Sequence, residues 1–95
     1  MILIGLALLM THTIEIEELV KDEVWIIRLN GDGSTFDAVC VIVRLDAVTI
    51  YACAALSLIK GGATEITKLS KPYFKEKDFT HYQYKHNGKP IKRAL

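Results

Sequence analysis

The chain has 95 residues, a length that suits one domain built around one hydrophobic core. Hydrophobic residues make up 51% of it and the mean hydropathy is +0.23, which excludes an intrinsically disordered chain. The formal net charge of +1 gives no strong overall field, so we expect a single folded domain over residues 1–95.

Residues 1–10 (MILIGLALLM) form an apolar N-terminal segment. The segment has about half the length that a bilayer span needs and lacks the basic start of a signal peptide. We expect a buried strand or a short helix, or an upstream extension if translation begins at Met10 rather than Met1. With no signal peptide or membrane span predicted, a cytoplasmic location is expected.

Two strands are predicted next. Residues 13–20 alternate isoleucine with glutamate, which is typical of a half-solvated strand near a sheet edge. Residues 23–29 (EVWIIRL) read as the neighbouring strand. The Asn, Asp and glycines of residues 30–34 then predict a turn, because these residue types tolerate positive φ.

The apolar run over residues 38–59 is interrupted by Arg44 and Asp46, which argues against a membrane helix. We divide it into strands at 36–45 and 48–56, folded back on each other as a paired ribbon at the centre of the protein. Val, Ile, Ala and Cys on both faces indicate strands that are covered on each side. Arg44 and Asp46 would then lie where the chain turns in solvent.

Residues 63–69 repeat apolar side chains at helical spacing, and Pro72 is expected to end this helix. Residues 79–85 alternate like a strand, and Asn87-Gly88 predicts a tight turn into a basic tail at 86–95. The predicted fold is a small α+β domain, mainly an antiparallel sheet of about five strands, with one short helix after residue 62.

Two cysteines lie on the predicted central strands. A two-residue turn at 46–47 would place Cys40 opposite Cys53, whereas a longer turn would place Cys40 opposite Tyr51. In either case we expect reduced core cysteines, because nothing indicates an oxidising compartment. The three histidines match no metal-ligand spacing, and Asn30-x-Asp32-x-Ser34 has a valine where a calcium loop needs glutamate, so no metal site is predicted.

Charge is divided unequally along the chain. Residues 1–35 carry two basic and six acidic side chains, whereas residues 71–95 carry seven basic and two acidic ones. The simpler interpretation is that the two ends neutralise each other, within the fold or across a dimer. Alternatively, the basic aromatic end binds nucleic acid, with bases stacked on tyrosines and phosphates on cations; the residues concerned are Tyr82, Tyr84, Lys85, Lys89, Lys92 and Arg93.

The order and spacing of elements over residues 23–95 resemble the core of a GNAT-type N-acetyltransferase: three consecutive strands, a glycine-bearing loop, a helix, a strand and an Asn-led basic segment. In that family the loop carries Q/R-x-x-G-x-G/A, whose backbone N–H groups bind the coenzyme A pyrophosphate at a helix N-terminus. The matching stretch, 58–63 (LIKGGA), keeps Gly61 and Ala63 and has Leu58 in place of Gln or Arg. The resemblance implies a shortened relative, a sheet that opens after residue 56, and an acetyl-CoA site at Lys60, Gly61, Gly62 and Ala63.

No nucleophile–base pair, dinucleotide loop or G-x-S-x-G elbow is present, so no catalytic residue is predicted. The leading hypothesis is a small non-catalytic binding or interaction module without a cofactor. It would act as a homo-oligomer, associating through residues 2–10, or with a protein partner. The first alternative is a reduced acyl-CoA-binding domain, which as an enzyme would be a GNAT-type N-acyltransferase. The second is nucleic-acid binding.

Overall fold

The computed structural model describes residues 12–31 and 35–95. Six strands and one helix follow one another in this part of the chain: β1 (Ile14–Val20), β2 (Val24–Leu29), β3 (Ala38–Arg44), β4 (Thr49–Ser57), α2 (Gly62–Glu76), β5 (His81–His86) and β6 (Lys89–Ala94). The apolar segment 1–10, and with it the choice between Met1 and Met10, lies outside the described residues. No helix within them is long and apolar enough to cross a bilayer.

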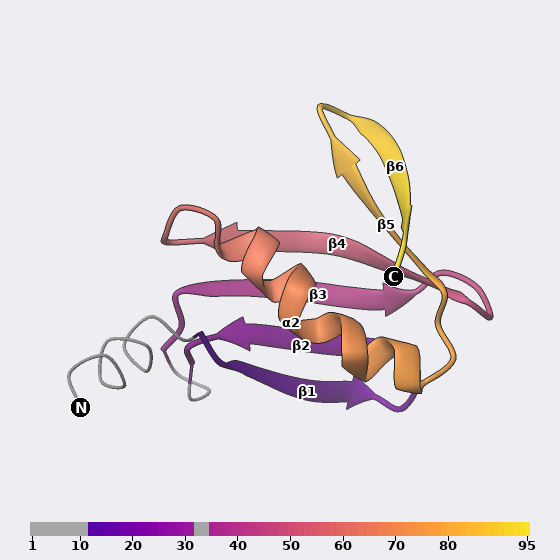
Figure 1. The fold of residues 1–95 in the computed structure, drawn as a ribbon, viewed down its shortest axis with the longest axis horizontal. Coiled ribbons are helices and arrows are strands. Elements are labelled where there is room, and N and C mark those ends of the chain that lie inside the picture. Colours follow the sequence, from indigo (N-terminus) through magenta and orange to yellow (C-terminus); the bar gives the residue numbers. More distant parts are fainter. Residues whose placement is uncertain (1–11, 32–34) are drawn as a thin grey trace, which may run out of the picture.

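The strands form one sheet in which sequence order is spatial order, β1-β2-β3-β4-β5-β6 (Figure 1). Adjacent strands are antiparallel except β4 and β5, which are parallel and connected by α2. The predicted small α+β domain with a mainly antiparallel sheet is therefore confirmed. Residues 36–56 do fold back on themselves, as β3 paired with β4.

β6 is the strand that was not predicted from the sequence. Residues 86–95, expected as a basic tail resembling the approach to a helix, instead end β5 and form β6. The predicted tight turn is present, with Asn87 at φ 52° and Gly88 at φ 76°, and it brings Lys89 opposite His86. Because β6 lies at an edge of the sheet, it tolerates Pro90 and several charged side chains.

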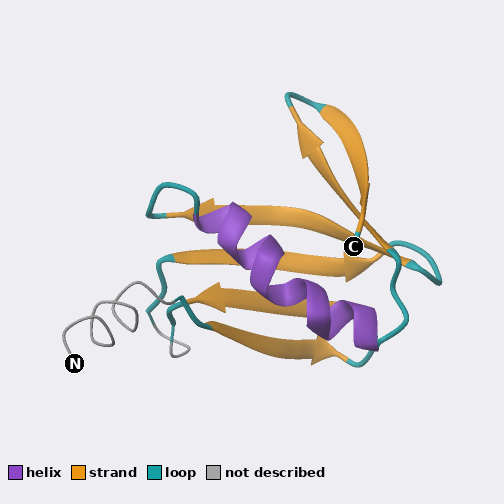
Figure 2. Ribbon diagram, in the orientation of Figure 1, coloured by secondary structure: helices purple, strands orange, loops and turns teal. Residues whose placement is uncertain are grey.

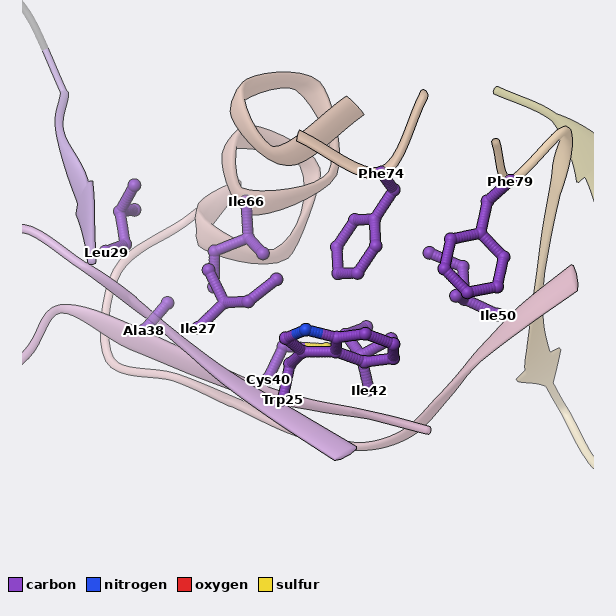
Figure 3. Packing of buried hydrophobic residues seen from close by; sticks show 10 residues of the cluster. All are labelled: Trp25, Ile27, Leu29, Ala38, Cys40, Ile42, Ile50, Ile66, Phe74 and Phe79. Atoms are coloured by element: carbon purple, nitrogen blue, oxygen red, sulfur yellow. The ribbon is translucent and has the colours of Figure 1, made fainter. Parts of the chain in front are cut away.

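The core lies between α2 and one face of the sheet. The helix crosses β1 to β4 diagonally and contacts all four strands (Figure 2). Alternate residues of β2 and β3 point toward it, as the two-residue period of a strand requires. The buried cluster consists of Trp25, Ile27, Leu29, Ala38, Cys40, Ile42, Ile50, Ile66, Phe74 and Phe79 (Figure 3).

The helix does not end at Pro72, as predicted, but continues to Glu76. A proline in a helix interior removes one hydrogen bond and costs about 3 kcal/mol. The turn that follows it carries Phe74, which is 0% exposed and meets the Trp25 ring edge to face at 5.2 Å between centroids. Burial of this ring offsets the cost at Pro72, since burying a large apolar side chain contributes about 1.5–3 kcal/mol.

The face of the sheet opposite α2 is only partly covered, contrary to the expectation for residues 36–45 and 48–56. Val39, Val41 and Val43 alternate with the buried residues of β3 and are partly exposed, and Leu56 on β4 is 54% exposed. Within the described residues, the one helix lies on the other side. In the described part of the chain, an apolar composition on both faces therefore did not imply two covering layers.

The register of β3 against β4 differs from both alternatives. Tyr51 pairs with Val43, and beyond a β-bulge that leaves Cys53 outside the ladder, Cys40 pairs with Ala55. Both cysteines are free, as expected, but only Cys40 is in the core, whereas Cys53 is exposed. The interpretation of Cys53 as a core residue was wrong.

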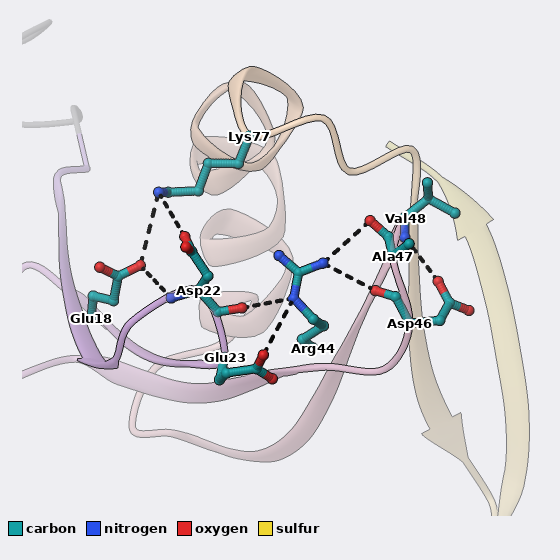
Figure 4. A network of polar contacts seen from close by, with 8 residues as sticks. All are labelled: Glu18, Asp22, Glu23, Arg44, Asp46, Ala47, Val48 and Lys77. Atoms are coloured by element: carbon teal, nitrogen blue, oxygen red, sulfur yellow. Dashed lines mark hydrogen bonds and ion pairs between the residues drawn. The ribbon is translucent and has the colours of Figure 1, made fainter.

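Arg44 connects the two turns at the same end of the sheet (Figure 4). Its Nε donates to the Asp22 carbonyl oxygen at 2.7 Å, and its Nη1 donates to the carbonyl oxygens of Asp46 and Ala47, each at 3.3 Å. Its guanidinium lies 4.6 Å from the centroid of the Phe79 ring. These contacts hold the β1–β2 turn, the β3–β4 turn and the approach to β5 together.

The sheet separates the acidic and basic parts of the sequence at its two edges. β1 carries Glu15, Glu17 and Glu18, whereas β6 carries Lys89, Lys92 and Arg93. Of the cations in residues 71–95, Lys77 is the one that pairs across the described fold, with Nζ 3.8 Å from both Glu18 and Asp22. Among residues 12–31 and 35–95, neutralisation between the two ends is therefore limited to Lys77, directly after α2.

Candidate functional site

The candidate site begins where two parallel strands separate. β4 and β5 pair at three positions only, Thr49 with His81, Ile50 with Tyr82 and Tyr51 with Gln83. Beyond these pairs, the β5–β6 hairpin turns away from the rest of the sheet (Figure 2). The sheet thus opens after Tyr51, not after residue 56, which the GNAT resemblance had implied.

A cleft of about 640 Å³ lies at this separation. Its volume is within the range of small-molecule sites, roughly 300–1,000 Å³. Four elements line it: the middle of β4, the first three turns of α2, part of β5 and one residue of β3. The lining residues are Cys40, Ala52, Cys53, Ala54, Ala55, Ala63, Thr64, Thr67, Lys68, Lys71, Tyr82, Tyr84 and Lys85.

Three lysines give the cleft a positive charge. Lys68 and Lys71 come from α2, and Lys85 comes from β5 on the other side. In the part of the chain that the structure describes, the ion pairs involve Arg28, Arg44 and Lys77, and none joins a carboxylate to these three lysines. Cations without a carboxylate partner around a concave surface favour an anionic ligand.

The polar residues that α2 contributes to this cleft were not predicted from the sequence. Thr64, Thr67, Lys68 and Lys71 follow the spacing i, i+3, i+4, i+7, which places them on one face of a helix. The helical spacing that predicted the apolar face of α2 also predicts this polar face. Nothing in the sequence indicated, however, that this face would lie across a gap from β5.

The predicted loop residues have different roles in the structure. Gly61 is the N-cap of α2 with φ 77°, a left-handed conformation that favours glycine. Gly62 is buried, and a Cβ there would lie 2.8 Å from the Cβ of Ala38. Lys60 is exposed and does not line the cleft, so Ala63 is the one of the four that does.

The six residues predicted to bind nucleic acid do not share one surface. Opposite pairs on the β5–β6 hairpin place Tyr82 beside Arg93 and Gln83 beside Lys92. Tyr82, Tyr84, Lys89 and Arg93 therefore alternate to one face of the hairpin. Lys85 and Lys92 alternate to the other face. On that side a hydrogen bond from the Val48 backbone N–H is the main cause that lowers the pKa of Asp46, and the charge of Lys92 is a smaller contribution.

The two cysteines at the cleft differ in reactivity. Burial raises the pKa of the Cys40 thiol to about 11, with the nearby Cys53 as the smaller cause. At pH 8 roughly one thousandth of such a thiol is thiolate, and its burial also blocks reagents. Cys53 is exposed and lines the cleft.

We therefore expect a thiol reagent such as DTNB at pH 8 to label one cysteine rapidly and the other only on unfolding. Cys53→Ser should abolish the fast phase, and the matched Cys40→Ser should keep it. Absorbance at 412 nm measures both phases. Two fast equivalents in the unmodified protein would contradict the burial of Cys40.

No three His, Cys, Asp or Glu side chains among residues 12–31 and 35–95 come together as a metal-ligand set. His81 and His86 occupy β5 positions of opposite alternation. Comparison with known proteins found no matching family model, curated protein or solved structure. The residues of the cleft are therefore the basis on which a ligand for it can be proposed.

Proposed function

We propose that this chain is a small binding module whose cleft takes a phosphate-bearing small molecule, acetyl-CoA being the first ligand to test. The observation that carries the proposal is the set of three lysines without carboxylate partners around the opening between β4 and β5. Lysine ammonium groups bind phosphate as point charges and need no fixed geometry.

The position of the cleft supports the same ligand class. Ligands of sheets with parallel strands bind outside the carboxyl ends of those strands, where neighbouring strands separate. β4 and β5 pair near their first residues and separate toward their carboxyl ends. The N-terminus of α2 lies at the carboxyl end of β4, and no side chain caps its first N–H groups. These N–H groups and the helix dipole add to the attraction for an anion.

The module acts by binding, in this proposal, rather than by catalysis. Cys53 is an exposed thiol in the described cleft, and no histidine or carboxylate lines the cleft to act as its base. General acid–base catalysis needs a proton-transferring group within hydrogen-bond reach of the reacting atoms. The acyltransferase alternative would therefore lack a histidine or carboxylate base in this cleft.

The test is a titration of the protein with acetyl-CoA by isothermal calorimetry at low ionic strength. Lys68→Ala combined with Lys71→Ala should weaken binding about tenfold, which equals about 1.4 kcal/mol. The matched control combines Lys60→Ala with Lys75→Ala, which removes the same charge from exposed positions outside the cleft. Equal losses in the two variants, or no binding of acetyl-CoA and of inorganic polyphosphate at millimolar concentration, would overturn the proposal.

Nucleic-acid binding is the second candidate function. The observation in its favour is that Tyr82, Tyr84, Lys89 and Arg93 share one face of the hairpin. We rank it below the cleft because Lys92 alternates to the other face, so the predicted residues do not form one continuous surface for a phosphate backbone.

A further inference from the structure

The bottom of the cleft is made of small side chains. Ala52, Ala54 and Ala55 of β4 and Ala63 of α2 line it together with the thiols of Cys40 and Cys53. None of these side chains extends far from the backbone, so they leave a shallow apolar space between the helix and the hairpin. Such an apolar lining is typical of the part of a small-molecule site that holds an apolar group.

One side of this space is aromatic. The rings of Tyr82 and Tyr84 stack with centroids 5.9 Å apart and planes at 17°. Lys71 also lies near the Tyr82 ring, with its Nζ 5.9 Å from the ring centroid. Tyr82 thus contacts both Tyr84 and Lys71, whereas Tyr84 has Tyr82 as its ring partner and is half-buried in the lining of the cleft. A further ring can extend the stack at Tyr84.

The other side of the space is polar and cationic. Lys68 and Lys71 lie one turn apart on α2 with Thr64 one turn before them. The Thr67 hydroxyl donates to the Ala63 carbonyl oxygen at 3.0 Å, so Thr64 has the hydroxyl that remains able to donate to a ligand. This side of the cleft provides two ammonium groups and one hydroxyl for phosphate oxygens.

We propose that the ligand is a mononucleotide: its base stacks on Tyr84 over the small residues of β4, and its phosphates bind Lys68 and Lys71. This inference rests on the proposed function, because it names the class of phosphate compound that the cleft takes. The occupant is a single nucleotide rather than a strand. The cleft holds about 640 Å³, and the cations that a strand would need next, Lys89 and Lys92, alternate to opposite faces of the hairpin.

The experiment compares three probes by calorimetry in magnesium-free buffer: ATP, inorganic tripolyphosphate and a ten-residue oligothymidylate. ATP should bind at least tenfold more tightly than tripolyphosphate, because base–aromatic stacking adds to the phosphate contacts. Tyr84→Leu should remove most of that preference and leave tripolyphosphate binding unchanged. Tyr84→Phe keeps the ring and should retain the preference, and the emission of Trp25 checks that both variants are folded.

The outcomes separate the two proposals. Equal affinity for ATP and tripolyphosphate, or a preference for ATP that survives Tyr84→Leu, overturns the nucleotide inference and leaves an anion-binding module. If none of the three probes binds and acetyl-CoA does not bind either, the proposed function itself fails. If the oligothymidylate binds more tightly than ATP and Lys89→Ala with Arg93→Ala abolishes this, the ligand is a nucleic-acid strand and the mononucleotide inference is overturned.

Discussion

Phe74→Ala is expected to lower the free energy of unfolding by about 3–5 kcal/mol, the range found when a buried phenylalanine is truncated in a core. The side chain is 0% exposed, and its ring meets Trp25 at 5.2 Å and Phe79 at 6.0 Å between centroids. Both partners lose edge-to-face contacts, and the proline two residues earlier leaves the last turn of α2 dependent on this anchor. The free energy of unfolding of a whole domain is only about 5–15 kcal/mol.

Urea unfolding followed by tryptophan fluorescence measures the effect, since Trp25 is the only tryptophan and lies against the altered site. Phe74→Leu fills most of the volume and should cost about 1–2 kcal/mol. If Phe74→Ala cost less than about 1 kcal/mol, the packing of α2 on β2 would have to be rejected.

Gly62→Ala should be the next most costly change, with a loss of about 3 kcal/mol, at the upper end of the range for overpacking. An added Cβ would lie 2.8 Å from the Cβ of Ala38 and would also overlap the hydroxyl of Ser57. The hydroxyl can rotate away, but the Ala38 methyl is fixed to the β3 backbone. Relief therefore requires that α2 move away from the sheet at its first turn.

Gly61→Ala is the matched control, because a Cβ there meets nothing within 4 Å and the strain comes only from φ 77°. Its cost should be about 1 kcal/mol. Thermal and urea unfolding compare the two variants directly. The double variant that combines Ala38→Gly with Gly62→Ala should lose less free energy of unfolding than the two single variants lose together, by about 1 kcal/mol or more. Simple additivity would show that the two positions do not touch.

Much of the sheet was predictable because its signals are local. Alternation of isoleucine and glutamate in residues 13–20 predicted an edge strand, and β1 is at an edge. The charges at Arg44 and Asp46 predicted the turn that joins β3 to β4. β6 was missed because its sequence, KPIKRA, has no strand signal of its own and forms a strand only by pairing with β5. The helix end predicted at Pro72 was wrong for a related reason, since burial of Phe74 outweighs the local preference of proline to end a helix.

The cleft was beyond local reasoning because it depends on which strands are neighbours. Gly61 and Gly62 were recognised from the loop, yet the structure gives one a backbone role and the other a packing role. Lys68 and Lys71 belong to a helical face that the sequence contains, but their position beside the cleft follows from the parallel pairing of β4 with β5, whose paired residues are 32 apart in the sequence. Cys53, at the bulge in β4, is also part of the lining, and no residue pattern predicted this bulge.

The separation of charge between the two edges of the sheet also governs how other molecules encounter this one. β1 and β6 are at opposite edges of a six-stranded sheet whose strands lie about 4.8 Å apart, whereas ions in physiological saline screen charge over about 8 Å. An approaching polyelectrolyte thus meets either an acidic rim, partly neutralised by Arg28 and Lys77, or a basic rim. A net charge of +1 therefore describes the titration of the chain but not its behaviour on an ion-exchange column, where we expect it to be retained by resins of both signs.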